Sequence, residues 1–405
     1  MSGRTCDSQV NSKHLTPVGR RLASIRIRRR PDEPLRLGET MSSTAFPRTI
    51  EAITPAWLTQ VLRNSGALGA AAVSGIACSS LGEGVGFMSA MQRLTLTYDG
   101  PAPGAPRSLV AKLAPLHPGA REIDKAFKFY ERETGFYGAI GPTSPVRAPR
   151  AYHVEFEAES HDFILLLEDM APARLGDQLA GLSVEDTTVA IRGVAGLHAQ
   201  WWEKPALRDY PWLADIDGPA FRPLQPIYQQ CWPALVDFLG DEMSPQLRTA
   251  GERFATRVDA LLDVVGTFPR TVMHGDYRAD NMFFDVGATA EPFAVADWQI
   301  TSNGPSAFDL AYLMTGSLSV ADRRRHQDDL LGLHHQILMD GGVSNYALKQ
   351  AREEYRHCAM LAWCWPVIAV GSLDMANERG VAFFHIWCER AMTAITDLKA
   401  WDLIP

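Results

Sequence analysis

Three oxygen-bearing side chains in the second half of the sequence have the types and the spacing that phosphoryl transfer requires. Asp276 and Asn281 lie five residues apart in the stretch His-Gly-Asp-Tyr-Arg-Ala-Asp-Asn, and Asp297 follows in Ala-Asp-Trp-Gln. Transfer of a phosphoryl group from a nucleotide needs a carboxylate that accepts the proton of the attacking hydroxyl, and oxygen ligands for the magnesium ion that bridges the phosphates. We expect Asp276 to be the catalytic carboxylate, and Asn281 and Asp297 to be the metal ligands.

The spacing of these residues is typical of a kinase. The five-residue step from Asp276 to Asn281 equals the step from aspartate to asparagine in the kinase catalytic loop, where a tight turn aims both side chains into one cleft. Asp297 closes the apolar run of residues 293–296, as expected for a residue at the end of a buried strand. The sequence therefore predicts a phosphotransferase of the kinase type.

Together with the Asp-Leu-Ala of residues 309–311, these motifs resemble the aminoglycoside phosphotransferase and choline kinase-like superfamily. The similarity extends from about Ile50 to about Pro366, with the motifs in the expected order. The combination of His-Gly-Asp-Tyr-Arg-x-Asp-Asn with Asp-Trp-Gln looks most like the bacterial phosphotransferases and the ecdysteroid kinase-like branch of that superfamily.

The resemblance implies an α+β fold with the two lobes of a protein kinase, a small antiparallel-sheet N-lobe and a larger, mostly helical C-lobe. It also implies ATP as the nucleotide and Mg2+ as the metal. Two further residues receive supporting roles from it. His274 would hold the catalytic loop through a hydrogen bond, and Asp309 would brace the same loop.

Lys112 lies inside an apolar strand pattern, residues 109–113, where an ammonium group is costly unless an anion meets it. We expect it to clamp the nucleotide phosphates, with Glu133 on the next helix as its orienting partner. Glu131 is the alternative partner, but proteins of the family typically place this glutamate three residues before Phe-Tyr, which favours Glu133. A surface lysine whose stem covers apolar side chains is the competing interpretation.

Two segments of the first half are predicted to contact the nucleotide through backbone groups. Gly82, Gly84 and Gly86 would let N–H groups approach phosphate oxygens without obstruction, although an ordinary hairpin turn would also contain glycines. Glu168 and Met170 fall where a hinge between the lobes would run, and backbone groups there would bind an adenine edge. A plain loop would have the same sequence.

Other polar and aromatic residues near the motifs have no assigned role. Arg278 and Asp280 can pair with each other or with phosphate oxygens. Several tryptophans could line an acceptor pocket, because aromatic faces attract cations, but core packing is the default interpretation. These tryptophans are Trp201, Trp202, Trp298, Trp363 and Trp365.

The elements that must position these residues change along the chain from strands to helices. A capped start at Thr54-Pro55 predicts the first helix, and residues 121–137 and the segment after Ser183 predict others. Alternating or continuous apolar residues predict strands, at residues 94–98, 109–113 and 163–167. The expected organisation is a basic tail or over-long start at residues 1–45, an N-lobe at residues 46–168 and a C-lobe at residues 169–405.

Composition excludes several classes of protein. The 405 residues carry a net charge of −8, and residues 1–40 alone carry +5, so the remainder carries −13. An acidic body argues against nucleic acid as the partner. No apolar run reaches the roughly 18 residues of a membrane-spanning helix, and six scattered cysteines suit a reduced, cytoplasmic location. The basic start is interpreted as a disordered tail, an extension before a true start at Met41, or a targeting segment.

The distance between two aspartates indicates what kind of acceptor is used. Only 11 residues separate Asp297 from Asp309, whereas a protein kinase needs a longer activation segment and an Ala-Pro-Glu-like anchor. We therefore expect a small-molecule hydroxyl as acceptor, of unidentified class. An inactive nucleotide-binding pseudokinase module is the alternative, and the oligomeric state is not predicted.

Overall fold

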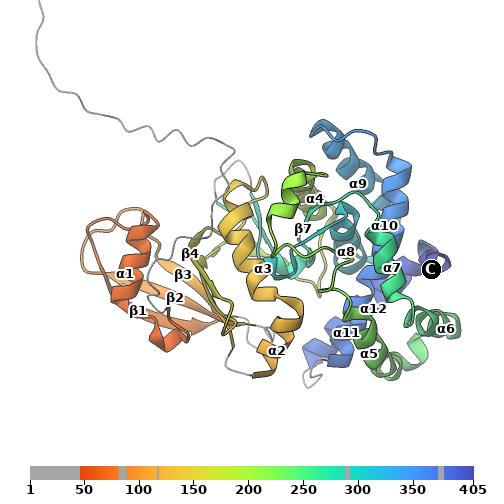
Figure 1. The fold of residues 1–405 in the computed structure, drawn as a ribbon, viewed down its shortest axis with the longest axis horizontal. Helices are drawn as coiled ribbons and strands as arrows, with labels where there is room; N and C mark the ends of the chain where they lie inside the picture. Colours follow the sequence, from red (N-terminus) through yellow and green to blue (C-terminus); the bar gives the residue numbers. More distant parts are fainter. Residues whose placement is uncertain (1–45, 82–88, 116–117, 288–291, 373–377) are drawn as a thin grey trace, which may run out of the picture. The chain divides into compact units, whose positions relative to one another are not determined.

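The computed structural model describes residues 46–81, 89–115, 118–287, 292–372 and 378–405. The residues from 46 onward belong to one compact unit. In Figure 1 the strands of the first part of the chain lie beside helix α1 (Pro55–Asn64), and most helices follow later in the chain. Among the described helices, none has the length and apolar content needed to cross a membrane.

The first part of the unit is a five-stranded antiparallel sheet with the strand order β1-β2-β3-β5-β4. The strands are β1 (Val73–Ser80), β2 (Ala90–Tyr98), β3 (Ser108–Leu113), β4 (Ala151–Glu157) and β5 (Asp162–Glu168). The three predicted strands are confirmed as β2, β3 and β5. The sequence analysis missed β1 and β4, the two edge strands, because their residues are mostly exposed or half-buried and lack a continuous apolar signal.

Strand β5 has an uninterrupted apolar sequence because both of its faces are buried. Phe163, Leu165 and Leu167 face the large core that continues into the helices, whereas Ile164 and Leu166 face a smaller core beneath helix α1. A strand that is buried on both faces loses the alternation of a half-exposed strand. The sheet is therefore the layer that joins the two lobes.

Helix α1 (Pro55–Asn64) covers the outer face of this sheet. The Thr54 side chain accepts a hydrogen bond from the Trp57 N–H at 3.2 Å, which caps the first turn. Leu58 and Leu62 recur at helical spacing and are fully buried in the smaller core. The predicted start at Thr54-Pro55 is confirmed.

The single helix predicted at residues 121–137 is wrong, because the chain breaks there into two helices and a further turn. Helix α2 (Pro118–Phe127) ends before Lys128, whose φ of 57° is left-handed. Helix α3 (Phe129–Gly135) then begins, and a π-helical turn, η2, covers Phe136–Ile140. Buried Asp124 accepts a hydrogen bond from the Tyr130 N–H at 2.8 Å, so it satisfies a backbone donor at the start of α3.

The second part of the unit is mostly helical. Helix α4 begins after Ser183, whose hydroxyl accepts from the Asp186 N–H at 3.0 Å, as the predicted cap requires. All residues of α8 are buried, which is typical of a central helix. The helices are α4 (Val184–Trp201), α5 (Leu224–Leu239), α6 (Pro245–Phe254), α7 (Val258–Val265), α8 (Ser306–Ser317), α9 (Val320–Asp340), α10 (Leu348–Ala362), α11 (Cys364–Ser372) and α12 (Glu378–Asp397).

Two small sheets lie within this helical part and carry the polar motifs. One pairs β7 (Thr271–Met273) with β10 (Ser302–Gly304), and the other joins β6 (Arg174–Leu175), β8 (Met282–Phe284) and β9 (Phe293–Val295). The predicted α+β fold, with an antiparallel-sheet N-lobe and a larger helical C-lobe, is confirmed. The boundary between the lobes at residues 168 and 169 stays a prediction.

Candidate functional site

Lys112 joins the sheet to the helical part. It lies on β3 on the face opposite the α1 core, and only 5% of the residue is exposed. Its Nζ lies 2.7 Å from Glu133 Oε2 on α3 and 2.8 Å from Asp297 Oδ1 beyond β9. Glu131 instead pairs with the exposed Lys128 at 3.4 Å. The partner of Lys112 on the helix is therefore Glu133.

The charges of this cluster determine its ionisation. Burial alone would lower the pKa of Lys112, but Asp297 and Glu133 outweigh it and raise that pKa above its ordinary value. Burial would raise the pKa of Asp297, and the attraction of Lys112 holds it below the usual range. Burial raises the pKa of Glu133, an effect that Lys112 opposes. The lysine is a fixed cation at the inner end of the site.

Asp276 and Asn281 are joined by direct hydrogen bonds. The Asn281 Nδ2 group donates to Asp276 Oδ2 and to the Asp276 carbonyl, both at 2.9 Å. A short 3-10 turn, η6 (Ala279–Asn281), closes the loop between them. Both residues are less than one-tenth exposed. Because Nδ2 is committed to Asp276, the Asn281 Oδ1 atom is the one that can face a cation.

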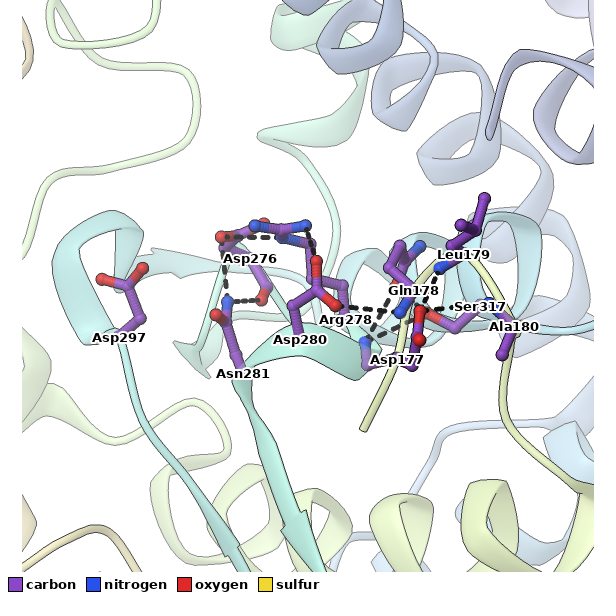
Figure 2. A network of polar contacts seen from close by, with 12 residues as sticks. Asp177, Gln178, Leu179, Ala180, Asp276, Arg278, Asp280, Asn281, Asp297 and Ser317 are labelled. Atoms are coloured by element: carbon purple, nitrogen blue, oxygen red, sulfur yellow. Dashed lines mark hydrogen bonds and ion pairs between the residues drawn. The ribbon is translucent and has the colours of Figure 1, made fainter. Parts of the chain in front are cut away.

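Neighbouring strands bring Asn281 and Asp297 together. Met282 on β8 pairs with Val295 on β9, and the Ala296 N–H donates to the Asn281 carbonyl at 2.9 Å. Asp297 follows at once with a left-handed φ of 66°. Figure 2 shows the side chains of Asp276, Asn281 and Asp297 in one region of the molecule.

These residues fit a magnesium ion shared with a nucleotide. In the described parts of the chain, no three His, Cys, Asp or Glu side chains form a metal cluster. Magnesium does not need one, because it is usually held by one or two carboxylates together with substrate phosphates and water. Asp297 and the Asn281 amide oxygen are hard oxygen donors of the required kind, and phosphate oxygens would supply the remaining ligands.

The backbone of the loop before Asp276 is fixed by His274. Its Nε2 donates to the Ala296 carbonyl at 3.0 Å and its Nδ1 accepts from the Asp276 N–H at 3.2 Å, so the neutral ring fits this network. Burial lowers the pKa of His274, although Asp309 and Asp276 oppose the change. Gly275 has a φ of +83°, and a side chain there would collide with the Ile300 carbonyl.

Asp309 on α8 also fixes this loop, through the backbone N–H groups of His274 and Gly275. Its Oδ2 accepts from the His274 N–H at 2.7 Å and its Oδ1 accepts from the Gly275 N–H at 2.8 Å. His198 on α4 contacts Asp309 Oδ2 at 3.1 Å and His334 on α9 at 3.0 Å. All four side chains are buried, so three helices meet at the base of the loop.

Arg278 lies beside Asp276. Its Nε approaches the Asp276 carboxylate at 3.3 Å and its Nη1 donates to Asp280 at 2.9 Å. Burial would lower the pKa of Arg278, but Asp276 and the other nearby acids raise it above its ordinary value. Asp280 also accepts from the Gln178 N–H at 2.9 Å. Figure 2 follows this network from Asp276 through Arg278 and Asp280 to the loop that contains Gln178.

The segment after Asp297 is clamped to α3. Arg132, which is 1% exposed, donates to the Ile300 and Thr301 carbonyls at 2.6 and 2.8 Å and also to the Ser302 hydroxyl. Phe136 stacks on Trp298 with a centroid separation of 3.6 Å. The helix that carries Glu133 is thereby fixed to the segment that begins at Asp297.

Some predicted site residues lie elsewhere or have other partners. Glu168 pairs with Arg147 at 2.7 Å, and Met170 packs in a small apolar cluster while its carbonyl accepts from the Ala173 N–H. The adenine-binding role of Glu168 and Met170 stays a prediction. Gly82, Gly84 and Gly86 lie outside the described residues.

The tryptophans considered for an acceptor pocket mostly serve packing. Trp298 and Trp363 are fully buried, and their ring N–H groups donate to the Val295 carbonyl and the Tyr228 hydroxyl. Trp202 contacts the Tyr346 ring. Core packing is therefore the better interpretation for Trp298 and Trp363.

Sequence reasoning missed the structural part played by Arg132 and His198, and it assigned Tyr137 none. Arg132 stands next to Glu133 in an amphipathic pattern that suggests solvent exposure, while its acceptors lie about 170 residues away. His198 meets Asp309 across 111 residues. The Tyr137 hydroxyl is buried one turn after Glu133 and forms no hydrogen bond within the described residues. No local signal identifies such contacts.

One protein-family model agrees with the motifs. The model of the ecdysteroid kinase-like family matches residues 83–342. No curated protein matches the sequence. Ethanolamine kinase from Plasmodium vivax is 12% identical, with a TM-score of 0.48 and coverage of 84% of this chain and 87% of that chain.

Two further solved structures have the same low sequence identity and similar TM-scores. Choline kinase from Streptococcus pneumoniae is 12% identical with a TM-score of 0.44, covering 84% of this chain and 98% of that chain. The GDP complex of aminoglycoside 2'-phosphotransferase-IIIa is also 12% identical, with a TM-score of 0.45 and the same coverage of 84% and 98%.

Proposed function

The chain belongs to the ecdysteroid kinase-like family, and from this premise we propose that it is a small-molecule kinase. It would transfer the γ-phosphoryl group of ATP, with magnesium, to a hydroxyl of a small acceptor. The observation that supports this most directly is the Lys112 ammonium between Glu133 and Asp297, at 2.7 and 2.8 Å, in the same site as the hydrogen-bonded Asp276 and Asn281. Kinase chemistry requires this combination of groups.

In this proposal Asp276 is the general base. The hydroxyl oxygen of the acceptor would form a bond to the γ-phosphorus while the bond from that phosphorus to the β-bridging oxygen breaks, which releases ADP. The proton of the hydroxyl would pass to the Asp276 carboxylate. The Asn281 amide, which donates to Asp276 at 2.9 Å, holds the carboxylate in position for this transfer.

The net charge of the site is negative, which favours binding of a divalent cation. Lys112 and Glu133 neutralise each other, Arg278 offsets one of the two acids it contacts, and Asp297 remains. The excess of two negative charges suits Mg2+, which would offset the charge of the phosphates and polarise them. Asp297 and Asn281 are the residues that would hold it.

The segment between Asp297 and Asp309 supports a small acceptor. Residues 300–309 are buried and contribute β10 and the first turn of α8. A protein kinase would present an extended activation segment here for peptide docking. This segment instead belongs to the core, which favours a small acceptor over a peptide.

The proposal is tested by Asp276→Asn, which keeps the shape of the side chain and removes the base. We expect Mg-ATP to raise the thermal midpoint of this variant as it does that of the wild type. Release of ADP with a panel of hydroxylated metabolites should fall by roughly 10²- to 10⁴-fold, the usual effect of removing a general base.

Asp285→Asn is the matched control, because Asp285 is an exposed aspartate that pairs with Arg174. It should retain full turnover. Undiminished turnover by Asp276→Asn would contradict the catalytic role of Asp276. A wild-type protein that Mg-ATP stabilises without any turnover on the panel would be an inactive nucleotide-binding module.

A further inference from the structure

Arg278 has a hydrogen-bonding group that the fold does not use. Its Nε lies 3.3 Å from the Asp276 carboxylate and its Nη1 donates to Asp280 at 2.9 Å. Within the described parts of the chain its Nη2 donates no hydrogen bond, and the side chain remains 18% exposed. A guanidinium has five N–H donors in a rigid fork, so one end of this fork is presented to the space beside Asp276.

The guanidinium is held in place from behind. Asp280 Oδ2 accepts from Arg278 Nη1, and Asp280 Oδ1 accepts from the Gln178 N–H at 2.9 Å. The Gln178 side chain in turn accepts from the Ala279 N–H at 2.9 Å and the Ser317 hydroxyl at 2.8 Å. Figure 2 shows these contacts as one continuous network on the side of Arg278 away from Asp297. A side chain braced in this way keeps its free end in one position.

The location of this cation matters for the reaction. Lys112 lies at the Glu133 and Asp297 end of the site, whereas Arg278 is the basic side chain that pairs with Asp276 among the described residues. A hydroxyl bound to Asp276 is the atom that attacks phosphorus. The phosphoryl group in transit, and any substituent next to that hydroxyl, must therefore pass close to Arg278. In either case a negatively charged oxygen near Arg278 would form a charge-assisted hydrogen bond with it.

We propose that Arg278 binds an oxyanion beside Asp276 through its free Nη2 group. The oxyanion is a phosphate or carboxylate oxygen, carried either by the phosphoryl group in transit or by an acidic substituent of the acceptor. The inference rests on the proposed kinase function. Arg278 would touch the reacting groups, and it is not among the residues that kinase chemistry in general requires.

The first test uses Mg-ADP with and without aluminium fluoride, which mimics the phosphoryl group in transit. The variants are Arg278→Gln and Arg278→Lys, with Arg174→Gln as the matched control, because Arg174 also pairs with two aspartates but lies away from Asp276. Mg-ADP should raise the thermal midpoint of all four proteins equally. If the phosphoryl group is the ligand, fluoride adds a further increase in the wild type and Arg174→Gln, a smaller one in Arg278→Lys and none in Arg278→Gln.

The second test addresses the acceptor, with glycerate and glycerol phosphate as probes and glycerol as the uncharged comparison. If the acceptor carries the oxyanion, the charged probes bind the wild-type Mg-ADP complex about tenfold to a hundredfold more tightly than the Arg278→Gln complex, the range of a lost charged hydrogen bond. Fluoride would then act equally on both proteins.

The outcomes distinguish failure of the Arg278 proposal from failure of the kinase proposal. Equal responses of Arg278→Gln and the wild type in both tests would overturn the inference and leave the kinase proposal intact. Absence of any stabilisation by Mg-ADP or Mg-ATP in the wild type would overturn both. The unliganded thermal midpoint of Arg278→Gln shows whether it folds, and Arg278→Lys supplies the comparison if that midpoint has collapsed.

Discussion

At the scale of single residues, Glu133 and Glu131 form a natural pair for experiment, because they lie two positions apart on α3 and only one meets Lys112. Glu133→Gln keeps the side-chain shape and removes the charge that orients the lysine. We expect kcat/KM for Mg-ATP to fall about tenfold, as for the loss of one charge-assisted hydrogen bond. Steady-state kinetics with saturating acceptor measures this.

Glu131→Gln is the control, since Glu131 only pairs with the half-exposed Lys128 at 3.4 Å. Surface ion pairs of this kind contribute about 0–1 kcal/mol. The two variants should therefore differ clearly in kinetics while both remain folded. Equal kinetic effects would show that Lys112 does not depend on Glu133 for its orientation.

The sequence predicts the reactive residues better than the residues that hold them in place. Asp276, Asn281 and Asp297 are recognisable because their chemistry demands particular types at short spacing. Arg132 is not recognisable in this way, since a charged residue on an amphipathic helix is usually solvent-exposed. Its burial depends on carbonyl groups of residues 300–301, which only the folded chain brings near.

At the scale of elements, the clamp between α3 and the segment after Asp297 is the contact that keeps Glu133 in place. Burial lowers the pKa of Arg132 to about 9, and its partners are neutral oxygens on Phe127 and on residues 300–302. Arg132→Lys keeps the charge but loses the fork that reaches several acceptors. We expect the free energy of unfolding to fall by about 2 kcal/mol, because buried carbonyls lose their donor.

Urea unfolding measures this change, and the stabilisation by Mg-ATP should fall with it, because α3 carries Glu133. Arg150→Lys is the control, since Arg150 is exposed and contacts the Tyr152 ring and the Ser65 carbonyl. That variant should unfold within about 0.5 kcal/mol of the wild type. Similar losses in both variants would contradict the importance of the clamp.

Elements with a strong local pattern were predictable, and those shaped by tertiary contacts were not. The caps at Thr54 and Ser183 and the apolar strand β5 follow directly from the sequence. The break at Lys128 does not, because it depends on the buried Asp124 that satisfies the next helix. The edge strand β1 has mostly small, exposed residues that carry little strand signal.

At the scale of the whole molecule, two buried histidines make stability depend on pH. Burial lowers the pKa of His334, and the nearby His198 lowers it further; burial also lowers the pKa of His274. The unfolded chain takes up protons near the ordinary value of 6.5, before the folded protein does. The free energy of unfolding should therefore fall as the pH drops below about 6.5, by up to about 1.4 kcal/mol per pH unit for each histidine.

Glu133 acts in the opposite direction, because burial raises its pKa and its protonation in the folded state favours folding as the pH falls. A comparison with His334→Gln isolates one histidine from such opposing groups. Urea unfolding between pH 7.5 and about 5 should show a shallower decline for this variant, although it is less stable at neutral pH. Parallel curves for the two proteins would mean that His334 does not contribute.

The Lys112–Glu133 pair is buried, with 2.7 Å between Nζ and Oε2. Arg132 and the stacked Phe136 and Trp298 keep α3 in that position. Movement of α3 away from Lys112 would separate buried donors and acceptors, and each group left without a partner costs about 1–3 kcal/mol. An outward swing of this helix, which would withdraw the glutamate from the lysine, is therefore resisted by the packing of the chain itself.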